Sequence, residues 1–150
     1  MGARFDKFEA GVEKIFGLLG AICFWAAFAY YYRDHKVPAT FGALASATVD
    51  VSAIAVGFIA TAKSILIGAP DQWIVKKLRE VGKFAPVMKY CMSAIWWCFA
   101  STVASGCCVY FDVGANDKAW VGAWFFVTGG AVFSCIRAIR IFGSVLRQFR

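Results

Sequence analysis

Four long apolar stretches constrain this chain more than any other feature of its sequence. They cover residues 15–32, 51–69, 85–111 and 119–136. Each is close to the length of about 20 residues that a helix needs to cross the hydrocarbon core of a bilayer. Lipid cannot satisfy free backbone groups, and the runs are continuous rather than alternating, so we expect helices and not a transmembrane barrel. The sequence therefore predicts an all-α integral membrane protein, a four-helix bundle that takes up residues 1–150 as a single domain.

The composition favours a membrane protein, and the sequence contains no motif of an enzyme. Hydrophobic residues make up 61% of the chain and charged residues 17%, against about half and about a quarter in soluble domains. No phosphate-binding loop, dinucleotide fingerprint, zinc-protease motif or nucleophile elbow is present. The six cysteines lack metal-ligand spacing, and the single His35 is far from them in sequence. We expect no enzyme activity, no catalytic residues, no metal site and no cofactor. Among the cysteines, only the adjacent pair Cys107 and Cys108 keeps a redox role open.

The distribution of basic residues predicts an orientation. Cytoplasmic flanks of membrane helices are enriched in Lys and Arg. Of the 16 basic residues, twelve fall in the N-terminal arm, around the loop between the second and third stretches, and in the C-terminal tail. Three fall on the other side, and Lys63 lies inside the second stretch. This asymmetry predicts that both termini lie in the cytoplasm, most simply at a bacterial inner membrane.

Two basic segments are expected on the cytoplasmic side. Residues 71–82 have an apolar stripe at helical spacing, as in a short helix lying on the membrane surface, and residues 137–150 form a basic C-terminal helix. Their candidate contacts with anionic lipid or with a cytoplasmic protein partner are Trp73, Lys76, Lys77, Arg79, Arg137, Arg140 and Arg147. Because no nucleic-acid-binding motif accompanies the charge, we expect no nucleic-acid partner.

The second stretch carries small and polar residues along one helical face. In chain order they are Ser46, Asp50, Ala53, Gly57, Thr61, Ser64 and Gly68. Small residues let helix backbones approach closely, so the face can serve packing and self-association. It can equally line a water-filled path at the centre of a bundle or oligomer. The candidate pore or packing residues are Asp50, Gly57, Thr61, Lys63 and Ser64.

Lys63 sharpens this choice. It lies about 9 Å from the inner end of the stretch, at a rise of about 1.5 Å per residue. Its long stem can carry the ammonium group to the inner interface, which needs no function. Alternatively, a ring of Lys63 side chains faces a pore and attracts anions, with Asp50 forming a ring of opposite sign at the outer mouth.

Part of the chain is similar to a known family. Residues 41–105 combine the small-residue stretch, an aromatic third stretch and a basic loop that reads Lys77, Leu78, Arg79, Glu80, Val81, Gly82. This combination resembles the RexB exclusion proteins of lambdoid phages and, in outline, other small four-span proteins of bacterial defence. The resemblance implies an inner-membrane ion channel that depolarises the cell when triggered, in phage exclusion or antiviral defence. It carries over no catalytic residues.

Three functions remain open on the sequence. The first is a homo-oligomeric channel or depolarising effector, with its pore between subunits. The second is a non-conducting anchor or scaffold that holds a cytoplasmic partner. The third is a small transporter, which is disfavoured because Asp50 and Asp112 lie at the edges of their stretches and no carboxylate lies deep in one.

Overall fold

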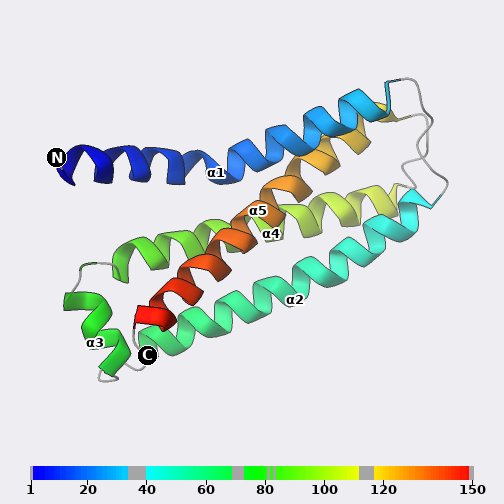
Figure 1. Ribbon diagram of the computed structural model, residues 1–150. Coiled ribbons are helices and arrows are strands. Elements are labelled where there is room, and N and C mark those ends of the chain that lie inside the picture. The colour runs from blue at the N-terminus through cyan, green and yellow to red at the C-terminus, as the bar shows by residue number, and fades with distance from the viewer. Residues whose placement is uncertain are drawn as a thin grey trace.

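The described part of the chain is helical throughout. The computed structural model describes residues 2–33, 40–68, 73–80, 82, 84–111 and 117–148, and most side chains between residues 17 and 143. Within these ranges there is no strand. The five helices are α1 (Gly2–Tyr31), α2 (Phe41–Gly68), α3 (Trp73–Glu80), α4 (Phe84–Tyr110) and α5 (Lys118–Gln148) (Figure 1).

Three of the described helices are long and apolar enough to cross a membrane. They are α2, α4 and the part of α5 over Lys118–Gly143. The apolar part of α1 within the described side chains, Gly17–Tyr31, is shorter. The described part of the chain is therefore all-α, and three of its helices meet the requirements of length and composition for crossing a membrane, as in an integral membrane protein. His35, Asp112 and Arg150 lie outside the described residues.

The second helix begins ten residues before the predicted apolar stretch. It starts at Phe41, where the backbone N–H of Leu44 donates to the carbonyl of Thr40 at 3.1 Å. At about 1.5 Å per residue its 28 residues span about 42 Å, which exceeds a hydrocarbon core of about 30 Å. Hydrophobicity marks only the part of a helix that lies in lipid, so it underestimates a helix that continues beyond.

The four long helices lie side by side in the spatial order α1, α5, α4, α2 (Figure 1). Helix α1 packs on α5 and helix α2 packs on α4, and these two pairs meet where α4 contacts α5. Helices α1 and α2 therefore occupy opposite edges. The last residues of α1 and α4 and the first residues of α2 and α5 lie at one end, here called the Tyr32 end, and α3 marks the other, the α3 end.

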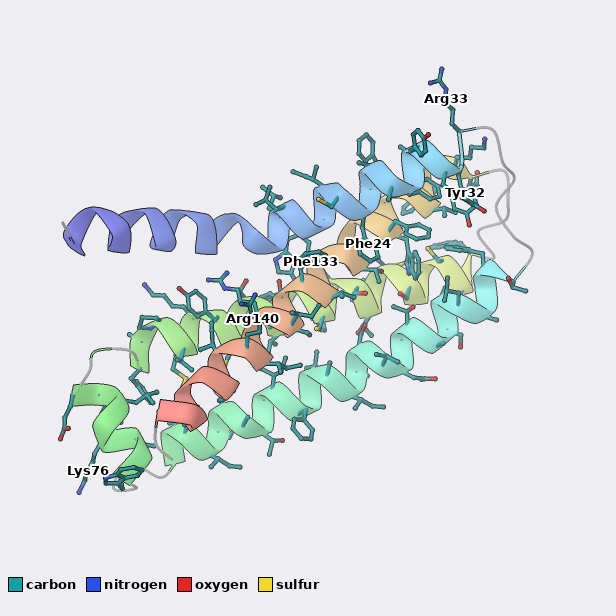
Figure 2. All side chains as sticks on the ribbon, viewed as in Figure 1. Phe24, Tyr32, Arg33, Lys76, Phe133 and Arg140 are labelled. Atoms are coloured by element: carbon teal, nitrogen blue, oxygen red, sulfur yellow. The ribbon has the colours of Figure 1, made fainter. Side chains whose placement is uncertain are left out.

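Glycines let the helices of the first pair approach closely. A Cβ atom added at Gly20 would overlap the ring of Phe133, and one added at Gly129 would overlap Phe24. The rings of Phe24 and Phe133 meet edge to face, with centroids 6.3 Å apart, and lie between α1 and α5 (Figure 2). Each large ring thus fills the notch left by a glycine on the opposite helix, which is a common way to pack membrane helices without a hydrophobic driving force.

The Tyr32 end is fastened by aromatic packing and by one lysine. A buried cluster there contains Phe28, Phe41 and Trp124 from three different helices. The ammonium group of Lys118, at the start of α5, donates to the carbonyls of Tyr32 at 3.1 Å and of Arg33 at 3.4 Å. A positive charge beside the last carbonyls of α1 is also favoured by the dipole of that helix.

At the α3 end, the short amphipathic helix α3 packs on the long ones. Val75 and Leu78 are buried, and Leu78 joins a cluster with Val87 and Cys91 of α4, against which side chains of α2 and α5 also pack. Helix α3 is followed by Gly82, whose φ of 69° is a left-handed conformation that favours glycine. Of the apolar stripe seen in the sequence, Leu78 therefore faces protein, whereas Trp73 is exposed.

Candidate membrane-embedded site

The small and polar face of α2 points away from the rest of the molecule. All seven of its residues are exposed, from Ser46 to Gly68. Nothing lies within 4 Å of a Cβ atom added at Gly57. The opposite side of the helix packs on α4 and contains the buried residues Phe41, Ala45 and Ser52. The structure thus keeps all seven sequence-predicted positions on one continuous face of α2, and no other helix covers them.

Helix α2 is also the least covered of the three candidate spans. Within its most apolar window only 6% of the residues are buried, against 28% in α4 and 39% in α5. The remaining exposed surface includes large apolar side chains beside the small-residue face, among them Val51, Ile54 and Phe58. Helix α2 therefore presents two kinds of surface, an apolar flank that suits lipid and a small, polar face that does not.

Polar groups on α2 differ in how they are satisfied. The hydroxyl of Thr61 donates to the carbonyl of Gly57 at 2.8 Å, and Thr48 donates to Leu44 at the same distance. Such bonds to the preceding turn let a hydroxyl face lipid at little cost. The carboxylate of Asp50 is exposed and lies about 14 Å from the Phe41 end of α2 at 1.5 Å per residue. Counted from the other end, it lies 18 residues, or about 27 Å, from Gly68. In a hydrocarbon core of about 30 Å that begins at Gly68 it sits near the far edge, where a charge is better tolerated than at the centre.

Lys63 does not share this face. Its ammonium group lies 3.3 Å from the sulfur of Met92 on α4, and the side chain is half-buried. Six residues separate it from Gly57, which turns it about 120° around the helix at 3.6 residues per turn. The structure thus brings Asp50, Gly57, Thr61 and Ser64 together and sets Lys63 apart, beside the α2–α4 interface.

A buried polar seam crosses the centre of the molecule and was not among the sequence-predicted site residues. The hydroxyl of Ser101 on α4 lies 3.5 Å from that of Ser52 on α2 and 3.3 Å from that of Thr128 on α5. One turn further along α4, Ser105 accepts a hydrogen bond of 2.7 Å from the indole N–H of Trp124. The signal in the sequence is the spacing of four between Ser101 and Ser105, which places both on one side of α4.

The cysteines are arranged differently from the sequence hypothesis. Cys107 is half-buried beside an open hollow of about 260 Å³ that Phe111, Asp117 and Trp120 also line, whereas Cys108 is buried in the aromatic cluster. Neighbouring residues on a helix point about 100° apart, so these two face different surroundings. The close pair is Cys98 of α4 and Cys135 of α5, whose sulfur atoms lie 3.2 Å apart.

The described basic side chains of the sequence-predicted contact surface lie in the half of the molecule that contains α3. Lys76, Arg79 and Arg140 are exposed, and Lys76 and Arg140 can be followed in Figure 2. The guanidinium of Arg79 lies 5.0 Å from the ring centroid of Phe84. That of Arg137 lies 3.7 Å from the ring centroid of Tyr90, a close cation–π contact on α4. The exposed Trp73 lies in the same half, and the side chains of Lys77 and Arg147 are outside the described part.

Comparisons of the chain with protein-family models, with curated proteins and with solved structures found no match. The resemblance to the phage exclusion proteins is therefore an expectation from the sequence that no relative tests. What the protein does has to be argued from the geometry of the membrane-embedded face and the charges at the α3 end.

Proposed function

We propose that this chain is a four-span membrane protein that assembles with copies of itself and conducts ions along a path lined by α2. The observation that carries the proposal is the direction of the α2 face. A row of small and polar residues, from Ser46 to Gly68, is exposed on the side of α2 that α4 does not cover. Hydrocarbon solvates the exposed carboxylate in this row poorly, whereas the α2 helix of another copy can pack closely against its small residues.

The composition of the face supports both assembly and conduction. Gly57 and its small neighbours let two α2 helices approach closely, as small residues do in membrane helix pairs. When the helices of several copies separate slightly, the same surface offers the hydroxyls of Thr61 and Ser64 to water. One face can thus close the path when packed and line it when open.

The charges on α2 favour cations. A ring of Asp50 carboxylates, one from each copy, would stand near one mouth of the path, and rings of acidic side chains select cations. Lys63 is turned about 120° from Gly57 and contacts Met92, so its ammonium group does not oppose them. The alternative in which a Lys63 ring attracts anions is disfavoured on this geometry.

Helix α1 supplies the fourth span in this proposal. Its apolar part exposes Leu18, Leu19, Ile22 and Trp25, side chains that suit lipid. The helix continues through the N-terminal arm to Gly2, so its 30 residues reach about 45 Å. Four crossings place both termini on one side, and the excess of Lys and Arg there makes that side the cytoplasm. The resemblance adds the setting, a bacterial inner membrane and a role in phage exclusion or defence.

The basic α3 end supports a second candidate, a non-conducting scaffold. Lys76, Arg79 and Arg140 are exposed in the half of the molecule that contains α3, and exposed basic side chains suit anionic lipid or an acidic cytoplasmic protein. In a channel the same side chains would receive the trigger. The two functions differ in whether ions cross, not in what this end binds.

Ion flux from proteoliposomes tests the proposal. Wild type is compared with Gly57→Leu, which fills the face, and with Phe58→Leu, a matched control one residue away whose ring is exposed on the apolar flank. We expect flux from wild type and Phe58→Leu and a loss of flux from Gly57→Leu. If folded, oligomeric wild-type protein gives no flux with or without anionic lipid, the chain is not a channel and the scaffold function is favoured.

A further inference from the structure

Cys98 and Cys135 form a close thiol pair between two helices that are distant in sequence. Their sulfur atoms lie 3.2 Å apart, one on α4 and the other on α5. A disulfide needs a sulfur–sulfur distance of about 2.0 Å. The remaining separation of roughly 1 Å is within reach of small side-chain rotations, so the two helices need not be rebuilt to join the sulfurs.

The pair lies deep in the membrane-spanning part of the molecule. Cys98 is 12 residues from the Tyr110 end of α4, about 18 Å at 1.5 Å per residue, and is buried. Cys135 is half-buried, the less buried residue of the two. Both are free thiols. An oxidant of this pair therefore has to be soluble in the membrane.

We propose that Cys98 and Cys135 are an oxidation site that converts to an intramolecular disulfide in the presence of a membrane-soluble two-electron oxidant. Each thiol loses its proton, the sulfur–sulfur bond forms, and the two electrons pass to the oxidant. When the oxidant is molecular iodine, the products are the disulfide, two iodide ions and two protons.

The disulfide would fasten the two halves of the molecule to each other. Helix α2 packs on α4 and helix α1 packs on α5, and the α4–α5 contact is where these pairs meet. A covalent bond between Cys98 and Cys135 fixes the register of α4 against α5. It restrains sliding or separation of the pairs while leaving the α2 face uncovered.

The chain provides a direct chemical test. Wild-type protein in lipid vesicles is treated with iodine, remaining thiols are blocked, and the unfolded chain is digested with trypsin. Cleavage after Lys89, Lys118 and Arg137 gives peptides 90–118 and 119–137, and Cys135 is the only cysteine of the second. A disulfide between them has the summed mass of both peptides less two hydrogen atoms, and fragmentation identifies the partner cysteine.

We expect this linked pair, with Cys98 as the partner, in protein that runs as a monomer without reductant. Cys98→Ser should abolish the link, whereas Cys91→Ser and Cys107→Ser, which remove other cysteines of the same peptide, should retain it. A link through any other cysteine, or no link when iodine has consumed the exposed Cys23, overturns the proposal. The readout is chemical, so it is independent of whether the protein conducts ions.

Discussion

Two glycines, one in a filled helix interface and one on an open face, provide the most direct test of how the helices pack. A Cβ atom added at Gly130 of α5 would overlap the indole of Trp97. The same indole lies 3.2 Å from a Cβ atom added at Gly17 of α1, so it is wedged between two helices and has little room to shift. At Gly57 of α2, by contrast, the added atom meets nothing within 4 Å. The same substitution, Gly to Ala, should therefore have opposite effects at the two positions.

The magnitudes follow from two competing effects. Forcing an extra methyl group into a filled space costs about 1–3 kcal/mol, and the wedged indole puts Gly130 at the upper end. Replacing glycine by alanine inside a helix stabilises the helix by about 0.8–1.0 kcal/mol. Gly130→Ala should thus lower the free energy of unfolding by about 2 kcal/mol. Gly57→Ala lacks the first effect and should leave the subunit as stable as wild type or more so.

The assay is reversible unfolding in mixed micelles, followed by the fluorescence of the tryptophans. A loss of about 2 kcal/mol lowers the folding equilibrium constant by about 30-fold, which shifts the midpoint well beyond experimental scatter. Gly17→Ala serves as a second position, where the added atom lies 2.8 Å from the hydroxyl oxygen of Ser134 and 3.2 Å from the same indole. Equal stability of Gly130→Ala and wild type would refute the packing of Trp97 described above. Destabilisation by Gly57→Ala at a concentration where the protein is monomeric would refute the open face of α2.

Three further predictions concern single side chains. Ser105→Ala removes the hydroxyl that accepts the indole N–H of Trp124 with little change in volume, and should lower the free energy of unfolding by about 0.6 kcal/mol, up to about 1.7, in the same assay; Ser93→Ala, at an exposed site of the same helix, is its control. Asp50→Asn should reduce the cation preference of the flux, measured as a reversal potential under a salt gradient. Lys63→Met should leave this preference unchanged, and a larger effect of Lys63→Met than of Asp50→Asn would show that Lys63 lines the ion path. Arg79→Gln removes the cation–π contact with Phe84, worth about 0.5–1 kcal/mol at an exposed site, so the amides of α3 should exchange hydrogen faster while those of α4 do not.

Hydrophobicity was sufficient to predict the helices but not their ends or their neighbours. Long apolar runs have few alternatives in lipid, which is why α2, α4 and α5 were foreseeable. The charge of Lys63 makes it a candidate for the small and polar face of α2, but the helical period places it about 120° away from Gly57. Its contact with Met92 depends on which helix lies next to α2, and the sequence does not state this.

The thiol pair and the polar seam depend on the register of α4 against α5. Ser101 meets Thr128, and Ser105, four residues on, meets Trp124, four residues back, as two antiparallel helices require. Periodicity shows which residues share a face of one helix, but not how far that helix slides along its partner. Close contacts such as Trp97 against Gly130 set this slide, so Cys98 and Cys135 become neighbours only once the packing is known.

The two edges of the molecule give the proposed assembly a direction. Helix α1, at one edge, exposes large apolar side chains such as Leu18 and Ile22, whereas α2, at the other, exposes its small and polar row. A lone subunit would present both edges to the same lipid, which suits α1 and the apolar flank of α2 but not the small and polar row. An assembly with α2 at its centre and α1 at its rim gives each edge the surroundings that its side chains favour. A cross-link between cysteines introduced at position 57 of two copies, and none between cysteines introduced at position 22, is the pattern that this arrangement requires.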